Sequence, residues 1–366
     1  MKTTIKREDL LGPLQQIIGA VERRQTLPIL GNILFKSSNG DLTLSATDLE
    51  IEMVASVAAN SPGDFQTTIP ARKLLDICKA LPEGADINFN IDETRVSLTC
   101  ARSRFTLSTL PAQDFPSLDE IDVQQTFTIP QKLLKGLFDK TSFAMAQQDV
   151  RYYLNGILME IDGSGIKLVA TDGHRLALSQ VSLESGVSED RQIIIPRKAV
   201  LELSRLLDSG DSPASCELSQ NHFRVETGSL IFTTKLIDGK FPDYQRVIPV
   251  DGNKTMQVDR GTLKQAMSRI AILSNEKYRG IRLTLSAGNL SIQANNPDQE
   301  EAEEELQVEY DESDMEIGFN VTYLIDVLNV LGSEKVQIKL KDSNSSAIMS
   351  DREDESSLYV VMPMRL

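Results

Sequence analysis

The most constraining feature of this chain is an internal repeat, with a spacing of roughly 125 residues. Segments 69–81, 195–207 and 319–331 align on one another without a gap. All three have an acidic residue at one aligned position, namely Asp76, Glu202 and Asp326. They also have a leucine at another, namely Leu81, Leu207 and Leu331. The period exceeds the roughly 20 to 50 residues of a solenoid repeat, and a unit of this size can hold its own core. The repeat therefore indicates several copies of one domain.

Further segments repeat in the same order. A strand-like segment begins near Leu30, Asn155 and Arg279, and each is followed by a turn and a second strand. Amphipathic helical stretches precede them at 10–21, 133–143 and 263–273. We therefore predict an α+β protein of three tandem helix and antiparallel-sheet domains, covering residues 1–124, 125–252 and 253–366. The repeat alone also allows three ordinary domains of unspecified role.

Two local predictions follow from side-chain patterns. The first helix should have Asp9 as its N-cap, which would place Pro13 in the first turn, where its missing N–H is not needed. The alternation of apolar and polar residues from Thr99 to Leu110 is typical of an antiparallel strand with one solvated face.

Composition excludes several function classes. The formal net charge of the 366 residues is −15, whereas a protein that grips DNA through many phosphates is normally basic, unless its basic residues gather on one surface. Three widely spaced cysteines, Cys78, Cys100 and Cys216, predict reduced, buried thiols in a cytosolic protein. No apolar run suits a membrane span, and the N-terminus does not resemble a signal peptide.

Basic residues recur on one face of the repeated helices. Arg72 and Lys79 are seven residues apart, as are Lys198 and Arg205, so each pair shares a helix face. The third repeat has Thr322 and Asn329 at these positions. The recurrence favours a shared basic surface over merely solvated helix faces.

Acidic residues are concentrated near the other end of the chain. Asp298, Glu300, Glu301 and Glu303 to Glu305 crowd one segment, while Arg95, Arg102 and Arg104 lie on predicted strand edges of the first repeat. Opposite charges at opposite ends of the chain favour a head-to-tail contact between two molecules of this chain, and such contacts can close into a ring. The alternative is that the acidic segment is simply a solvated loop.

The chain resembles the bacterial DNA polymerase III beta subunits, the family of replicative sliding clamps, over its whole length. The segments that carry the resemblance are TLPILGN (26–32), QDVRYYLNG (148–156), ATDGHRLA (170–177), FPDY (241–244), ILSNEK (272–277) and YVVMPMRL (359–366). The resemblance implies a DNA-clamp fold in which two three-domain subunits join head to tail into a ring. Helices would line a hole for duplex DNA, and acidic surfaces would face outward.

Site residues are implied by this resemblance. DNA contacts are expected from Arg24, Arg72, Gln148, Tyr152, Tyr153, Arg197 and Arg205. Tyr152 and Tyr153 also fit packed strand aromatics. The subunit interface is expected to comprise Arg102, Arg104, Phe105 and Leu107 on one side, and Ile272, Leu273, Glu300, Glu301, Glu303 and Glu304 on the other.

A cleft that binds partner peptides is also implied. Its expected residues are Leu154, Thr171, Gly173, His174, Arg175, Leu176, Pro242, Arg246, Val247, Tyr278, Asn320, Tyr323, Ser346, Val360, Met362, Pro363, Met364 and Arg365. Adaptable methionines suit a groove that serves several peptides. Tyr278 replaces an expected Phe, and Asn344 an expected apolar residue.

The predicted function is to encircle double-stranded DNA, slide without sequence preference and tether the replicative polymerase, which confers processivity. Implied partners are the polymerase alpha subunit, the clamp-loader delta subunit, other polymerases and repair proteins with short peptide motifs, and a second copy of the chain. We expect a cytoplasmic, nucleoid-associated protein without catalytic residues, metal or cofactor. Two alternatives are an enzyme built on Asp172 and His174, and a protein-only scaffold that does not touch DNA.

Overall fold

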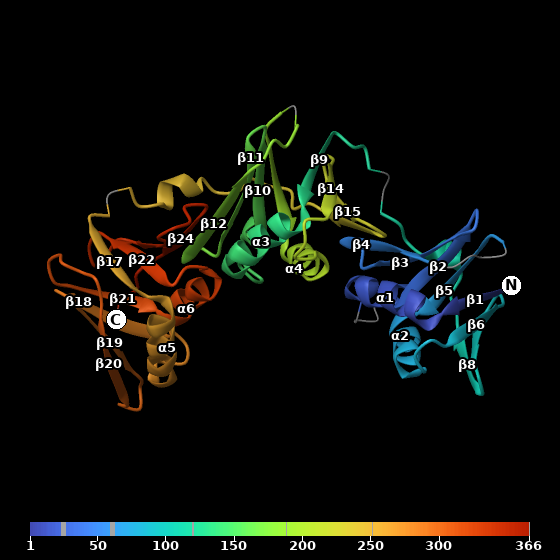
Figure 1. Ribbon diagram of the computed structural model, residues 1–366, viewed down its shortest axis with the longest axis horizontal. Helices are drawn as coiled ribbons and strands as arrows, with labels where there is room; N and C mark the ends of the chain where they lie inside the picture. Colours follow the sequence, from blue (N-terminus) through green and yellow to red (C-terminus); the bar gives the residue numbers. More distant parts are fainter. Residues whose placement is uncertain (23–26, 59–62, 119–120, 188, 251, 366) are drawn as a thin grey trace. The chain divides into compact units, whose positions relative to one another are not determined.

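The computed structural model describes residues 1–22, 27–58, 63–118, 121–187, 189–250 and 252–365. By its contacts the chain forms two compact units, one of Met1–Lys132 with Glu202–Leu236 and one of Leu133–Leu201 with Ile237–Leu366. Within them the same succession of elements occurs three times: strand, helix, four strands, helix, three strands (Figure 1). This confirms the predicted α+β fold of three copies of one domain.

The elements of each copy are as follows. The first contains β1 (Lys2–Lys6), α1 (Arg7–Ile17), β2 (Asn32–Ser38), β3 (Asp41–Thr47), β4 (Ile51–Val57), β5 (Phe65–Pro70), α2 (Ala71–Ala80), β6 (Asp86–Ile91), β7 (Arg95–Cys100) and β8 (Ser103–Ser108). The second contains β9 (Gln125–Pro130), α3 (Gln131–Thr141), β10 (Gly156–Asp162), β11 (Gly165–Thr171), β12 (Arg175–Ser182), β13 (Arg191–Pro196), α4 (Arg197–Leu206), β14 (Pro213–Leu218), β15 (His222–Thr227) and β16 (Leu230–Lys235). The third contains β17 (Lys254–Asp259), α5 (Arg260–Ile270), β18 (Gly280–Ser286), β19 (Asn289–Asn295), β20 (Glu301–Gln307), β21 (Met315–Asn320), α6 (Val321–Val330), β22 (Lys335–Leu340), β23 (Ala347–Asp351) and β24 (Ser357–Val361).

Strand pairing joins neighbouring copies inside each unit. The first unit holds a four-stranded sheet, β1-β6-β7-β8, and an eight-stranded sheet, β5-β2-β3-β4-β16-β15-β14-β9. The second holds the eight-stranded sheet β13-β10-β11-β12-β24-β23-β22-β17 and the four-stranded sheet β20-β19-β18-β21. Each eight-stranded sheet thus consists of two four-stranded halves, which meet at the antiparallel pairs β4–β16 and β12–β24. All the strand pairs among the described residues are antiparallel, as the alternating sequence pattern predicts.

The repeated helices begin and end at equivalent positions. The helices α2, α4 and α6 each start two residues after the aligned Ile69, Ile195 and Phe319. The helix α2 ends before Leu81, whose backbone is extended because a proline follows. Its apolar face buries Leu74, Leu75 and Cys78, and a buried leucine contributes roughly 1.5–3 kcal/mol. All three cysteines are free and buried, as predicted.

Two local predictions were wrong. The helix α1 begins at Arg7, with Lys6 rather than Asp9 as N-cap, because β1 leads directly into it and the Arg7 amide donates to the Ala85 carbonyl. Pro13 therefore lies inside the helix, beyond its first turn. The stretch from Thr99 to Leu110 is not one strand, because a hairpin turn with Ala101 at φ 50° separates β7 from β8. Arg102 lies in this turn rather than on a strand edge.

Candidate functional site

The strands β12 and β24 lie side by side in the second unit (Figure 1). A buried cluster of apolar side chains lies at their junction. It contains three of the predicted cleft residues, Leu154, Leu176 and Val360, whose side chains are almost fully buried. Phe241 and Tyr244 complete it from a segment that follows β16. These three predicted residues are therefore brought together, as the floor of the site rather than its exposed wall.

The equivalent position in the first unit is polar. Thr171 pairs with Leu176 across its hairpin as Thr47 pairs with Glu52, which makes Leu176 and Glu52 equivalent. In the joined strands they face Val360 and Thr233. Burial raises the pKa of Glu52, and the Arg224 side chain donates to the Thr233 hydroxyl at 3.3 Å. Of these two junctions, only β12–β24 offers an apolar floor at this position.

A tight turn borders the cluster at the start of β12. The Thr171 hydroxyl donates to the Arg175 carbonyl at 2.6 Å, and Gly173 has a φ of 89°, which favours glycine. The Asp172 carboxylate accepts from the backbone amides of His174 and Arg175. These bonds occupy Asp172 in the turn, so the structure gives no support to an acid–base pair with His174.

The Arg175 side chain is largely buried and bonds to several neighbouring elements. Its guanidinium donates to Asp172, to Asp326 of α6 at 2.5 Å and to the carbonyl of Phe143 at 2.8 Å. It also lies over the rings of Phe143 and Tyr323, at 5.2 Å and 4.5 Å from their centroids. Its side chain is only 11% exposed. Arg175 therefore holds elements of the second and third copies together beside the cluster.

The C-terminal segment completes the surroundings of the turn. The Met362 amide donates to the His174 carbonyl and the Met364 amide to the Gly318 carbonyl, both at 2.9 Å. The His174 ring lies against that of Tyr323, with planes 21° apart. The other predicted residues of this part are half-buried or exposed; they are Asn320, which caps α6, Ser346, Pro363, Arg365 and Tyr278. Asn344 is exposed.

The segment 238–250, which we call the strap, crosses the cluster. Phe241 and Tyr244 point into it, while Pro242, Arg246 and Val247 are exposed. The Tyr244 hydroxyl donates to a carboxylate oxygen of Glu160 on β10 at 2.7 Å. The predicted residues Pro242, Arg246 and Val247 thus sit on a segment that is fastened mainly by its side chains.

The loop 147–153 carries three predicted DNA contacts. Gln148 is exposed with a φ of 57°, and Tyr152 and Tyr153 lie in a 3₁₀ turn with their rings edge to face, not in a strand. Two hydrogen bonds between Asp149 and Asn155 close the loop. The Arg151 guanidinium bonds to Asp149 and lowers the pKa of that carboxyl to about 2. The loop is therefore braced and leaves Gln148 and Tyr152 open to solvent.

The four predicted arginines differ in their surroundings. Arg72 is exposed on α2, whereas Arg197 is half-buried and donates to the Met145 carbonyl. Arg205 donates to the carbonyls of Gln15 and Gln16 at the end of α1, and pairs with Glu202. Arg205 thus braces α4 against α1. Arg24 lies outside the described residues.

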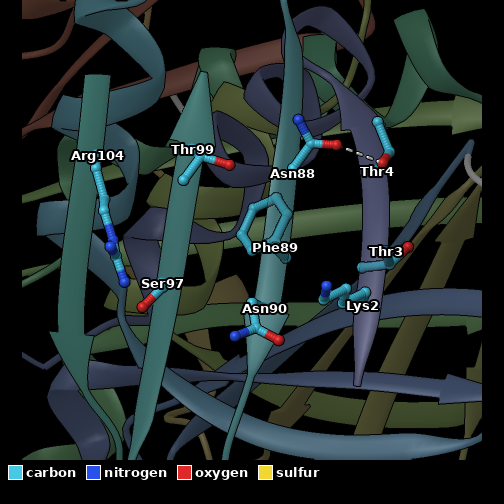
Figure 2. Close-up of a pocket in the computed structure, with 9 residues that line it drawn as sticks. All are labelled: Lys2, Thr3, Thr4, Asn88, Phe89, Asn90, Ser97, Thr99 and Arg104. Atoms are coloured by element: carbon cyan, nitrogen blue, oxygen red, sulfur yellow. Dashed lines mark hydrogen bonds between the residues drawn. The ribbon is translucent and has the colours of Figure 1, made fainter. Parts of the chain in front are cut away.

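Most of the predicted interface residues lie on two strands at sheet edges or in the turns beside them. The strand β8 is an edge of the first four-stranded sheet and β20 an edge of the last. Phe105 and Leu107 point to the inner side of β8, and Arg104 to its outer face. Figure 2 shows Arg104 beside Ser97 and Thr99, on a depression of about 580 Å³ otherwise lined by β1 and β6. Among the described residues, Arg104 has no acidic partner.

The acids of β20 are not equivalent. Glu301 and Glu303 line the outer face, and among the described residues the donors to the Glu303 carboxylate are the neutral side chains of Ser291 and Gln293. Glu304 lies on the opposite face and is paired with Arg269 of α5. Glu300 accepts from Asn296 in the preceding turn. Nearby, Ile272 is 76% exposed and Leu273 half-buried.

Sequence reasoning missed several of these partners. Glu160, Tyr244 and Phe143 were not singled out. The aligned acids did carry a signal, since Asp326 binds Arg175 and Glu202 binds Arg205. Tyr244 belongs to the FPDY motif, which pointed to this segment but not to its anchor.

No helix in the described ranges is long and apolar enough to cross a membrane. The same residues contain no cluster of potential metal ligands.

Comparison with known proteins places the chain in a family. Residues 1–119, 128–243 and 245–365 match the models of the N-terminal, central and C-terminal domains of the DNA polymerase III beta subunit. The beta sliding clamp of Pseudomonas aeruginosa is 55% identical over the full length of both chains. A crystal structure of the DNA polymerase sliding clamp from that organism with ligand has a TM-score of 0.97 at 53% identity, with full coverage of both chains. Another, described as bound to griselimycin, has a TM-score of 0.96 at 54% identity, again with full coverage. The chain therefore belongs to the DNA polymerase III beta subunit family, the beta sliding clamps.

Proposed function

We propose that this DNA sliding clamp of the replicative polymerase, a processivity factor and not an enzyme, stays on DNA because two copies close into a ring around it. The observation that carries the proposal is the repetition of the strand order. In each copy the fourth strand of one half-sheet is β4, β12 or β20, and that of the other is β8, β16 or β24. The junctions β4–β16 and β12–β24 use two of each, which leaves β20 and β8.

The remaining edges, β8 and β20, could form an equivalent junction between two chains. A β8–β20 pair formed head to tail twice would close a ring of two chains with six domains. It would also cover two strand edges in each chain that would otherwise invite aggregation. This supports the proposed homodimer and its interface residues.

The existing junctions predict the register of the new one. Ala55 pairs with Leu230 and Ser179 with Ser357. Through the adjacent hairpins, Glu304 is equivalent to Ala55 and Ser103 to Leu230. Glu303 of one copy would then face Arg104 of the other on the outer side, and Ala302 would face Phe105 inside. In this register an acidic side chain would face a basic one on the outer side, and two apolar side chains would face each other inside.

We assign weak, sequence-independent DNA contacts to Arg72, Gln148, Tyr152, Tyr153 and Arg197, with Arg24 and Arg205 as further members of the set. Few phosphate contacts suit a protein that must slide, because each contact adds affinity and acts as a brake. The exposed Arg72 and the braced loop around Gln148 support this assignment. Arg205 would act mainly through its brace on α1.

We assign peptide motifs of the polymerase alpha subunit, the clamp-loader delta subunit and other DNA-processing proteins to the cleft over the β12–β24 cluster. Its apolar floor and adaptable Met362 and Met364 support this assignment. Since a related clamp is described as bound to griselimycin, we propose that this chain binds it here too. The domain boundaries 1–124, 125–252 and 253–366, and a cytoplasmic, nucleoid-associated location, complete the proposal.

Deleting Met362–Leu366 tests the cleft. Griselimycin binding, followed by surface plasmon resonance, should be lost, because the tail borders the turn at His174. Ring formation should persist, because the β8 and β20 edges are untouched. Unchanged binding after the deletion would contradict the assignment.

A further inference from the structure

The strap has a single polar anchor beneath the cleft residues that it carries. From 238 to 250 the described backbone makes no hydrogen bond to the sheets, whereas the Ile237 amide still donates to the Ile194 carbonyl. The strap is therefore held by the buried Phe241 and Tyr244, the half-buried Ile248, and the bond from the Tyr244 hydroxyl to Glu160. Pro242, Arg246 and Val247 depend on these anchors for their positions.

Glu160 is itself fixed in place. It lies between Gln192 and Lys167 across the neighbouring strands of the sheet. Gln192 donates to one of its carboxylate oxygens at 2.7 Å, and the Lys167 ammonium lies 3.6 Å from the other, which also accepts from Tyr244. Burial and this bond raise the pKa of Tyr244, so the hydroxyl remains a donor. A fixed acceptor can thus orient the strap through one bond.

The first copy lacks the corresponding pair. Its segment begins with Phe115-Pro116, as the strap contains Phe241-Pro242, and Leu118 occupies the place of Tyr244. Lys36 faces Thr43 as Glu160 faces Lys167, so Lys36 occupies the place of Glu160. Leucine and lysine cannot form this anchor. The pair occurs beside the apolar junction and not beside the polar one, which links it to the cleft rather than to the fold shared by the copies.

We propose that Tyr244 is a positioning residue for partner binding: its hydrogen bond to Glu160 fixes the strap so that Arg246 and Val247 form a wall of the cleft. This inference rests on the proposed function of the cleft. Tyr244 and Glu160 do not touch the partner themselves, so their effect is transmitted through the strap.

The test compares Tyr244→Phe with Tyr310→Phe in the full-length clamp. Tyr310 is an equally buried tyrosine whose hydroxyl donates to the Ser313 carbonyl at 2.6 Å, on the β20–β21 connection. Each variant loses the hydrogen bond that its hydroxyl donates and keeps its ring. With griselimycin as probe in surface plasmon resonance, Tyr244→Phe should weaken binding about five-fold, in line with the loss of one such bond. Tyr310→Phe should leave binding unchanged.

Two further measurements separate positioning from general destabilisation. Glu160→Gln replaces the carboxylate by an amide whose carbonyl oxygen can still accept from the Tyr244 hydroxyl, so this variant should bind like the unaltered clamp. Glu160→Leu removes the acceptor and should match Tyr244→Phe. The rate of backbone amide hydrogen exchange in residues 241–248 should rise in Tyr244→Phe and Glu160→Leu. It should not rise in Tyr310→Phe or Glu160→Gln.

The outcomes also separate this inference from the proposed cleft. If the unaltered clamp and the Met362–Leu366 deletion bind griselimycin equally, the cleft assignment fails. If the deletion abolishes binding but Tyr244→Phe behaves like Tyr310→Phe, the cleft stands and the positioning role of Tyr244 is overturned.

Discussion

At the residue scale, the two strand junctions differ in the residue types of one equivalent cross-strand pair. Leu176 faces Val360 at the β12–β24 junction, and Glu52 faces Thr233 at the β4–β16 junction. The first pair is apolar and belongs to a cluster, while the second is linked to Arg224. Contact with an apolar side chain of a peptide is favourable only at the first pair. At the second pair the same contact would remove water from polar groups, which costs free energy.

This contrast predicts the effect of exchanging the two residue types. Leu176→Glu should weaken griselimycin binding by about ten-fold or more, since a carboxylate replaces the apolar floor. The matched change Glu52→Leu should leave binding unaltered. Surface plasmon resonance measures both, with thermal unfolding to confirm that each variant is folded. Equal binding by Leu176→Glu and the unaltered clamp would contradict the role of the cluster.

The sequence reveals residue types but not all their partners. The resemblance predicted Leu176 and Val360, and the structure brings them into contact. It also assigned Arg205 to DNA and Arg175 to the cleft. Their internal partners, Gln16 and Asp326, lie 189 and 151 residues away along the chain. Such pairs depend on tertiary packing, which a local pattern cannot specify.

At the element scale, helices with repeated patterns were predicted well and strand boundaries less well. The helices α2, α4 and α6 were placed correctly because three aligned segments supported one another. The start of α1 was misplaced because capping preference is weak beside a strand that leads straight into the helix. The turn at Ala101 was missed because its residues carry no glycine or proline signal.

The two sheet edges carry the prediction for subunit assembly. Arg104→Glu would place like charges opposite Glu303 at both junctions and should weaken dimerisation by about ten-fold. Adding Glu303→Arg should restore it, because the charges are exchanged. The control Arg104→Glu with Glu304→Arg should not, because Glu304 lies on the other face of β20 and already pairs with Arg269. Analytical ultracentrifugation measures the dissociation constants, and rescue by the control pair would contradict the predicted register.

At the scale of the whole molecule, the repeated domain suggests how an acidic protein could stay on DNA without many phosphate contacts. A net charge of −15 is unsuited to a tight grip on phosphates. A closed ring needs no tight grip, because the DNA cannot leave sideways. Three copies of one domain per chain, joined by the same strand pairing throughout, would supply such a ring from two chains.

The most direct measurement follows the clamp on DNA whose topology is changed. The clamp is loaded onto a nicked circle with a cognate loader and ATP, and the circle is then cut at one site. The ring account predicts long retention on the intact circle and rapid loss from the ends of the linear form. Equal retention on both forms would show that direct contacts hold the protein, which would contradict the ring.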